Sequence, residues 1–418
     1  MNDKQKPSIR FKGFTEAWEQ RKLGEVFETV TDYVAAGSFA DLGENVRYLD
    51  FPDYAQLVRT MDLKNNFTSS NEVYVDKSAY EYLYRVDLNQ ECIILPNIGN
   101  CGEVYLIKPE KLPYRHNVLG PNAILVRSKK YNHSFLSTLL LGDNFQKKLS
   151  LIISPNGQTK FNKTELKNID IILPGSVDEQ YHIGEYFRNL DNNLITLHQR
   201  KYDKLVNVKK SMLEKMFARD GKNVPEIRFA GFTEAWEQRK LGEVVSVYDG
   251  VHQTPDYKES GIMFLSVEDI TSLRSEKYIS EEAFKKDYKV YPQKGDILMT
   301  RIGDVGTTNV VETTEKLAFY VSLALLKPNG INSYFLSNAI QSPLFQKGLK
   351  DRTLVTAIPQ KINKDEIGKV DLILPKSVVE QKQIGEYFRN LDYLITLHQR
   401  EVEKLKNIKK SCLEKMFV

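Results

Sequence analysis

Two long segments of the chain carry apolar residues at helical spacing. In each segment the apolar residues follow one another in steps of three or four, with one polar interruption: Ile183, Phe187, Leu190, Leu194, Leu197 and Leu205 in the first, and Ile384, Phe388, Leu391, Leu394, Leu397 and Leu405 in the second. Such steps place side chains on one narrow stripe of an α-helix. The pattern predicts helices over about 177–217 and 378–417, each just after a proline, at Pro174 and Pro375.

The two predicted helices are expected to pack on each other, because a lone helix that exposes an apolar stripe is poorly stable in water. The second helix lacks one residue relative to the first, which predicts a local overwinding of its stripe. If a pseudo-twofold axis relates the two halves of the chain, the helices run antiparallel. With about 40 residues at 1.5 Å rise, each would form a rod of roughly 60 Å. The pair is therefore predicted to be a coiled-coil spacer.

Shorter β-rich runs bounded by Gly, Pro or Asn precede each helix and predict strands: Ile93–Leu95, Ile169–Leu173, Asp296–Met299 and Asp371–Leu374. The fold class is therefore mixed α/β, with two α/β modules separated by two long antiparallel helices. The domains follow as an N-terminal segment and first module (1–176), a central spacer helix (177–218), a second module (219–377) and a C-terminal spacer helix (378–418).

An internal repeat supports this division. Between Pro7–Phe27 and Pro225–Val245, 18 of 21 positions are identical, and Ile183–Asp191 returns unchanged as Ile384–Asp392. The stretches between these blocks show little overall similarity, yet they keep the same frame. A tandem duplication explains the identical blocks. The divergent stretches indicate one fold with two different surfaces, and thus two related modules that recognise different things.

Composition narrows the class of protein only slightly. Hydrophobic residues make up 41% and charged residues 27%, which is typical of a globular chain. The 59 Lys and Arg against 55 Asp and Glu give a net charge of +4, a weak indication of a polyanionic partner. Three cysteines without C-x-x-C spacing argue against disulfides and structural zinc. No signal peptide is recognisable at Met1–Lys6, and the longest apolar stretch, Phe319–Leu326, is too short to span a bilayer. We expect a cytoplasmic protein without membrane contact.

The motifs of catalysis are missing from the sequence. It contains no phosphate-binding Gly-x-x-x-x-Gly-Lys-Ser/Thr loop, no Asn/Asp-Pro-Pro-Tyr/Phe motif of amino-methyltransferases, and no metal-ligand pattern. Pro52-Asp53 followed by Asp62-Leu63-Lys64 resembles a nuclease metal site, but the second module has no equivalent. We therefore predict no catalytic residues and no metal. A stand-alone nuclease is the alternative that metal-dependent cutting by the purified chain would support.

Several motifs recur in a fixed order: Trp18–Glu25 and Trp236–Glu243, Leu173–Gln180 and Leu374–Gln381, with Asp249–Pro255 and Lys294–Gly306 in the second half. In this combination the chain resembles the specificity subunits of type I restriction–modification systems over essentially its whole length. The resemblance implies two target-recognition domains, each reading one half of a bipartite sequence in double-stranded DNA. It also implies two methyltransferase subunits that dock on the helical pair, and optionally two restriction–translocase subunits.

The resemblance further implies that S-adenosylmethionine, ATP and Mg²⁺ bind to the partner subunits and that no cofactor binds to this chain. A coiled-coil adaptor without sequence-specific DNA reading is the alternative. In an assembled complex it would bind DNA without sequence preference.

Candidate DNA-contacting residues lie in polar loops. In the second module, His252, Gln253, Thr254 and Tyr257 occupy a proline-containing loop, and Arg301 follows a strand, where it could make a bidentate contact to guanine. Lys160 and Lys361 occupy matching frames and could hold phosphates. In the first module Asn97 and Asn100 are the candidates, although Asn97 cannot take the role of Arg301. Gly303 and Gly306 are expected to serve a turn.

Overall fold

The computed structural model describes residues 6–68, 71–154, 159–219 and 221–418. The chain divides into two compact units: unit 1 contains residues up to His198 together with Glu401–Val418, and unit 2 contains Gln199–Arg400. Each unit thus combines one α/β module with parts of two long helices. The predicted domain boundaries set the long helices apart from the modules, whereas the two compact units divide both helices between them.

The same four-stranded antiparallel sheet occurs in both units, with the order β2-β8-β5-β6 in unit 1 and β11-β17-β14-β15 in unit 2. Its strands are β2 (Thr29–Asp32), β8 (Ala123–Arg127), β5 (Cys92–Pro96) and β6 (Tyr105–Ile107), and β11 (Val245–Asp249), β17 (Leu323–Pro328), β14 (Ile297–Thr300) and β15 (Thr308–Val310). The inner strands β5 and β14 are buried along their whole length. This explains why their sequences are apolar runs and not alternating patterns.

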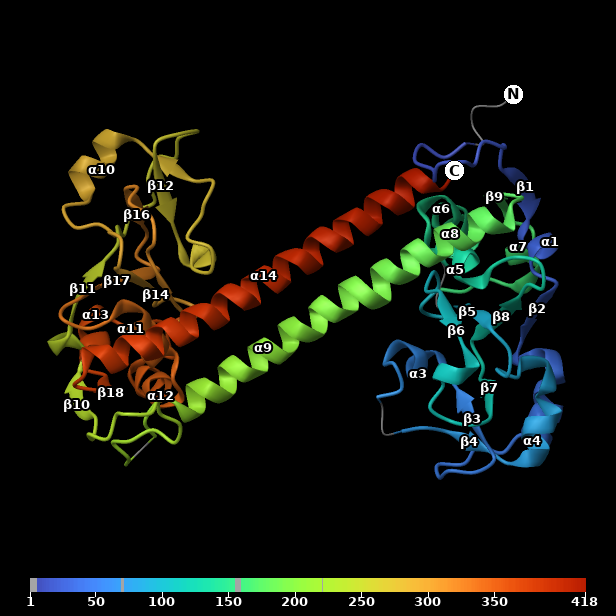
Figure 1. The fold of residues 1–418 in the computed structure, drawn as a ribbon, viewed down its shortest axis with the longest axis horizontal. Helices are drawn as coiled ribbons and strands as arrows, with labels where there is room; N and C mark the ends of the chain where they lie inside the picture. The colour runs from blue at the N-terminus through green and yellow to red at the C-terminus, as the bar shows by residue number, and fades with distance from the viewer. Residues whose placement is uncertain (1–5, 69–70, 155–158, 220) are drawn as a thin grey trace. The chain divides into compact units, whose positions relative to one another are not determined.

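Each unit also contains a three-stranded sheet, in the order β4-β3-β7 in unit 1 and β13-β12-β16 in unit 2. Its strands are β4 (Tyr74–Val75), β3 (Ala55–Val58) and β7 (Asn117–Leu119), and β13 (Tyr278–Ile279), β12 (Ile262–Leu265) and β16 (Leu317–Phe319). Helices α2 (Phe39–Asn45), α3 (Thr60–Lys64) and α4 (Lys77–Tyr82) belong to this part of unit 1, and α10 (Glu281–Asp287) to that of unit 2. Each such lobe has its own apolar core, and in each unit it lies away from the long helices (Figure 1).

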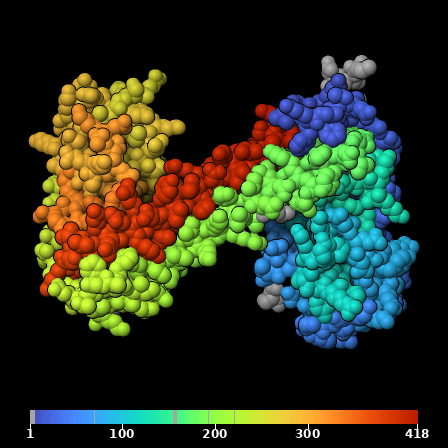
Figure 2. Space-filling view, viewed as in Figure 1, coloured from blue at the N-terminus to red at the C-terminus, as the bar shows by residue number. Residues whose placement is uncertain are grey.

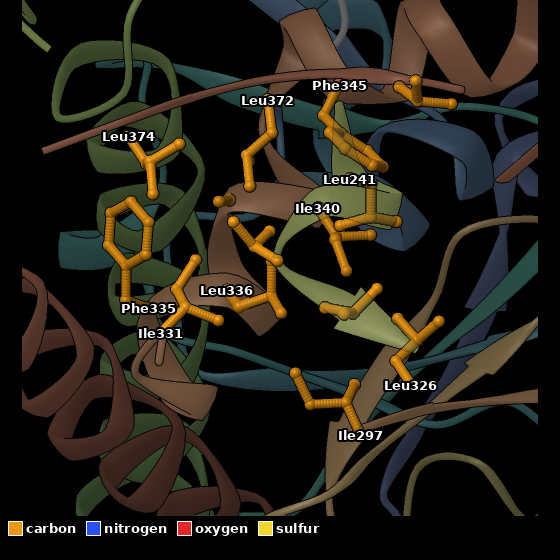
Figure 3. Packing of buried hydrophobic residues seen from close by; sticks show 14 of the residues in the cluster. Leu241, Ile297, Leu326, Ile331, Phe335, Leu336, Ile340, Phe345, Leu372 and Leu374 are labelled. Carbon is orange, nitrogen blue, oxygen red and sulfur yellow. The ribbon is translucent and has the colours of Figure 1, made fainter. Parts of the chain in front are cut away.

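The lobe beside the long helices contains the rest of each module. In unit 1 it comprises β1 (Glu19–Lys22), α1 (Leu23–Val26), α5 (His133–Leu141), α6 (Asp143–Ile152), α7 (Lys163–Lys167) and β9 (Asp170–Leu173); in unit 2, β10 (Glu237–Lys240), α11 (Ser333–Gln341), α12 (Pro343–Arg352), α13 (Lys364–Gly368) and β18 (Asp371–Leu374). The pairs β1–β9 and β10–β18 have the same register, with Glu19 opposite Leu173 and Glu237 opposite Leu374. Figure 3 shows the unit 2 core, where Ile340 of α11 lies near Leu241, and Phe335 of α11 lies near Leu374.

The first long helix is interrupted by a wider turn. It consists of α8 (Val177–Arg188), a π-helix (Asn189–Ile195) and α9 (Thr196–Lys215), whereas the second is one continuous helix, α14 (Val378–Met416). A π-helical turn absorbs one extra residue by bonding from i to i+5. The predicted overwinding of the second helix is therefore wrong: the length difference is accommodated in the first helix, and α14 stays regular.

Within each unit the long helices run antiparallel. In unit 1, Tyr186 lies 3.5 Å from the Cys412 sulfur, and the Lys409 ammonium lies 2.8 Å from Asp191, so numbering rises on one helix as it falls on the other. In unit 2, Lys209 pairs with Asp392 at 2.6 Å, and the Phe217 ring lies 5.6 Å from that of Phe388. The predicted fold class, with antiparallel long helices and a repeated α/β module, is confirmed.

Burial along the predicted stripe is uneven. The buried positions are Ile183, Phe187, Leu190, Ile384, Phe388 and Leu391. All of them except Leu190 belong to the apolar cores of the modules. Leu205 and Leu405 are half-buried. Leu194, Leu197, Leu394 and Leu397 are 39–46% exposed, because two helices alone cover only part of each other's surface.

The end of α14 completes the core of unit 1. Met416 is buried in it, and the Phe417 ring packs edge-on against Trp18 at 6.1 Å. The N–H of Ile9 donates to the Lys415 carbonyl at 3.0 Å, and Figure 2 shows the last turns of α14, in red, against the N-terminal segment in blue. Unit 1 is thus built from the two ends of the sequence. In the described ranges, no helix is long and apolar enough to cross a membrane.

Candidate nucleic-acid interface

The repeated motifs form a polar clamp inside each unit. Arg10 donates two hydrogen bonds to the Glu179 carboxylate at 2.6 and 2.7 Å, and the Trp18 indole donates a third at 3.3 Å. In unit 2, Arg228 and Trp236 make the same bonds to Glu380. Both glutamates are 1% exposed. The Trp-containing opening and the Glu-Gln pair at the start of the long helix are therefore two sides of one structural contact.

The glutamine of each Glu-Gln pair closes the clamp. The Gln180 amide donates to the Pro174 carbonyl at 2.9 Å, and its oxygen accepts from the Asn132 N–H at 3.1 Å. Gln381 makes the equivalent bonds to Pro375 and Asn332. Because these residues are buried and satisfied within the frame, they hold the module in place and leave recognition to other residues.

The loop after β11 carries most of the candidates in unit 2. It leaves the sheet at Gly250, where an added Cβ would lie 2.4 Å from the Phe319 carbonyl oxygen, so only glycine fits. The next residue, Val251, bonds to Phe319 at 3.2 Å. The following polar side chains, His252, Gln253 and Thr254, are exposed. Tyr257 is 42% exposed and stands edge-on against Phe264 at 5.6 Å. These four residues are therefore accessible to a ligand.

Arg301 directly follows β14 and is buried. Its side chain is 7% exposed, pairs with the Asp249 carboxylate, and donates from Nε to the Ile362 carbonyl at 3.1 Å. Burial lowers the pKa of Arg301. A direct contact between this side chain and a base would require these internal bonds to be given up.

Lys361 is exposed beside the turn that follows Arg301. Ile302 bridges to Lys361, and Gly303 and Gln360 exchange two hydrogen bonds at 2.8 and 2.9 Å. Gly303 and Gly306 have φ values of 80° and 98°, as the turn predicted from the sequence requires. The structure thus brings Arg301 and Lys361 together.

Unit 1 repeats this backbone arrangement with different side chains. Phe161 donates from its N–H to the Asn97 carbonyl at 3.1 Å, and the Asn97 amide donates back to the Phe161 carbonyl at 3.2 Å. Ile98 bridges to Lys160, which is exposed, as is Asn100. Asn97 and Lys160 therefore occupy the backbone positions of Arg301 and Lys361, as the matching sequence frames predict.

Sequence reasoning missed two features of the site. It did not identify Asp249 as the partner of Arg301, although Asp249 is the first residue of the motif Asp249–Pro255. It also passed over three exposed apolar residues just before Lys361: Leu354 at 45%, Val355 at 66% and Ile358 at 101%. The signal for these was an apolar run where the equivalent sequence of the first module, 154–159, is polar.

The residues of the nuclease alternative are engaged elsewhere. Asp62 is 1% exposed and accepts hydrogen bonds from the Arg59 side chain at 2.8 and 2.9 Å. Over the part of the chain that the structure describes, no group of three or more His, Cys, Asp or Glu residues could hold a metal ion. The geometry therefore does not support a metal-dependent nuclease at Asp62.

Comparison with known proteins defines the family. The family model for the type I restriction modification DNA specificity domain matches twice, over residues 15–207 and 233–407. The chain therefore belongs to the family of type I restriction–modification specificity subunits, which are non-catalytic subunits. The family predicted from the sequence motifs is confirmed.

Curated relatives agree with this assignment, and solved structures have a similar fold. The chain is 24% identical to the specificity subunit of the type I restriction enzyme MjaVIII of Methanocaldococcus jannaschii, over 77% of each chain. It is 24% identical to the putative MjaX specificity subunit of the same organism, over 95% of this chain and 92% of that one. The fold is similar to that of the type I S subunit from M. genitalium, with a TM-score of 0.62 at 15% identity over 99% of both chains. A chain from a structure on assembly of the type I system has a TM-score of 0.50 at 15% identity, over 95% and 96%.

Proposed function

We propose that this chain determines which DNA sequence a type I restriction–modification complex modifies. Each unit reads one half of a bipartite target in double-stranded DNA, and the paired long helices set the gap between the halves. Contacts to base edges carry the sequence preference, while contacts to phosphates position the protein. The chain itself performs no chemistry.

One observation carries this proposal: the two units have the same frame but different surfaces. Their sheets have the same strand order, and their clamps contain the same residue types. The segments that leave the equivalent strands β2 and β11 differ, however. In unit 1 the chain continues as a 3-10 helix (Tyr33–Ala36), and in unit 2 as the polar loop with His252–Thr254. A frame that both units share, with loops that differ, is suited to two different half-sites.

The proposed contacts follow from exposure. His252, Gln253 and Thr254 are accessible for hydrogen bonds to base edges, and Tyr257 stands beside them in the sequence. Lys160 and Lys361 are exposed on equivalent turns and are proposed to bind phosphates. Asn100 is the exposed candidate of unit 1. Asn97 and Arg301 serve as supports for these turns, since their side chains bond to the backbone of the neighbouring segment.

The catalytic steps belong to partner subunits. We propose that two methyltransferase subunits dock on the helical pair, that restriction–translocase subunits join optionally, and that S-adenosylmethionine, ATP and Mg²⁺ bind to these partners. The methyltransferase would flip the target adenine out of the duplex, and this chain would fix where it does so. Such a complex acts in the cytoplasm, where bacterial and archaeal DNA lies.

Methylation mapping tests the proposal. The chain is co-expressed with its methyltransferase in a host without competing modification, and methylated adenines are located by single-molecule sequencing. A split motif with a constant gap is expected. An unsplit motif would contradict the two-module proposal. DNA binding by the assembled complex without any sequence preference would instead support a coiled-coil adaptor.

A further inference from the structure

An aspartate occupies the same place at the end of the first sheet strand in both units. In unit 1, Asp32 ends β2 and lies opposite Ile124 of the neighbouring strand; in unit 2, Asp249 ends β11 and lies opposite Ala324. Ile124 and Ala324 in turn pair with Leu95 and Met299 on the next strand. Leu95 lies two residues before Asn97, and Met299 lies two residues before Arg301. Asp32 and Asp249 are therefore equivalent, as are Asn97 and Arg301.

Each aspartate pairs with a cation, but the cation comes from a different element. Asp32 accepts from the Lys163 ammonium at 2.7 Å, at the first position of α7. Asp249 instead pairs with Arg301. The carboxylates are 14% and 25% exposed. At this degree of burial, a partner cation stabilises the carboxylate because it offsets part of the desolvation penalty.

Unit 2 retains a lysine where unit 1 has its cation. Lys364 is the first residue of α13, directly after Asn363, just as Lys163 follows Asn162 in α7. Lys364 is exposed, and α13 packs against β11 as α7 packs against β2. Asn97 also shows what an asparagine does in the place of Arg301: its amide donates to Phe161, the counterpart of the bond from Arg301 to Ile362.

We propose that Arg301 is a positioning residue for DNA reading and not a base-contacting one, and that Lys364 is an alternative counter-cation for Asp249. This inference rests on the proposed function. Arg301 holds Asp249 and thereby sets the point at which the loop with His252–Thr254 leaves the sheet. The loop begins at Gly250, the residue after Asp249, so a shift of this carboxylate shifts the loop that follows.

The test combines Arg301→Asn with Lys364→Ala in the full chain, assembled with its methyltransferase. Arg301→Asn converts the unit 2 arrangement into that of unit 1, so Lys364 should form the ion pair with Asp249 in place of Arg301. Half-site preference should then be unchanged and the affinity for target DNA should fall less than about threefold. Lys364→Ala alone should have as little effect. In the double variant, the methylation rate should fall at least about tenfold, which is comparable to the effect of one mismatched base pair in the target. This loss should be confined to the half-site that unit 2 reads.

Unit 1 supplies the matched control. Lys163→Ala should weaken reading of the other half-site, and Asn97→Arg in the same chain should restore it, because arginine then supplies the cation from the position of Arg301. Circular dichroism and unfolding midpoints establish that each variant is folded.

Two results would overturn the inference. One is a changed base preference at a single position in Arg301→Asn, which a base-contacting arginine would produce. The other is that the effects of the two single substitutions simply add in the double variant, which means that Arg301 and Lys364 are not energetically coupled. Coupling is also measurable in the unfolding free energy without DNA. An unmethylated or unsplit target in the unaltered chain would count against the proposed function, whereas absent coupling in unfolding counts against this inference alone.

Discussion

Replacement of Glu179 by glutamine should selectively destabilise unit 1. The carboxylate is 1% exposed and accepts two bonds from Arg10, whose side chain is 14% exposed, and one from Trp18. Glutamine has nearly the same shape but removes the charge, so the Arg10 guanidinium remains buried without an anion. Breaking a buried ion pair in this way costs about 3–5 kcal/mol. Because Arg10 retains some exposure, we expect a loss near the lower end, about 3 kcal/mol.

The measurement uses the two tryptophans of the chain, Trp18 and Trp236, one in each unit. Both are buried, at 1% and 2% exposure, so a fluorine label on each indole reports unfolding of its own unit by ¹⁹F NMR during a denaturant titration. Glu179→Gln should move the Trp18 transition and leave that of Trp236 in place. Glu380→Gln should do the reverse.

The matched control is Glu185→Gln, also on α8. Glu185 pairs with Arg188 at the surface, with side chains 22% and 41% exposed, so its loss should cost less than about 1 kcal/mol. A loss below about 1 kcal/mol for Glu179→Gln, or an equal shift of both tryptophan signals, would refute the reasoning that the clamp is a buried element of one unit.

Three further outcomes are expected. Exchange of residues 28–152 for the corresponding stretch of another family member should change one half of the methylated motif and spare the other; changes in both halves would contradict separate reading. A chain of residues 1–217 should form a homodimer in light scattering, because its last helix can supply to a second copy the contacts that 401–418 supply to unit 1; a folded monomer would contradict this. Burial lowers the pKa of His133, so unit 1 should lose stability as the pH falls below about 6.5, where the unfolded state takes up the proton first. His133→Ser, which copies Ser333 of unit 2, should reduce that loss, and an unchanged pH profile would count against it.

Much of the fold was predictable because its determinants are local or repeated. The stripe from Ile183 onward predicted a helix because apolar residues at helical spacing indicate one covered face. The runs at Ile93 and Ile297 predicted strands because they are short, β-rich and bounded by Gly, Pro or Asn. The duplication predicted two equivalent modules, and the glycines of Gly303 and Gly306 predicted a turn, which their positive φ values confirm.

The site was predictable only in part. Exposed loop residues such as His252 were identified by their neighbours in the sequence, but Arg301 looked the same whether it faced a base or a carboxylate. Its partner Asp249 lies 52 residues away, and only the register of the sheet brings them together. Sequence spacing carries no information about such a pair.

By itself, the sequence determined the repeat, the two long helices, the four strands predicted from β-rich runs, and the family, since these depend on side-chain periodicity and on residue identity along the chain. Only the tertiary structure decided how the extra residue of the first long helix is accommodated, which residues the clamp buries, and that the last 18 residues complete unit 1. The physical reason is that these outcomes depend on competition between distant groups for the same buried space and the same hydrogen bonds. That competition is settled only when the chain has folded.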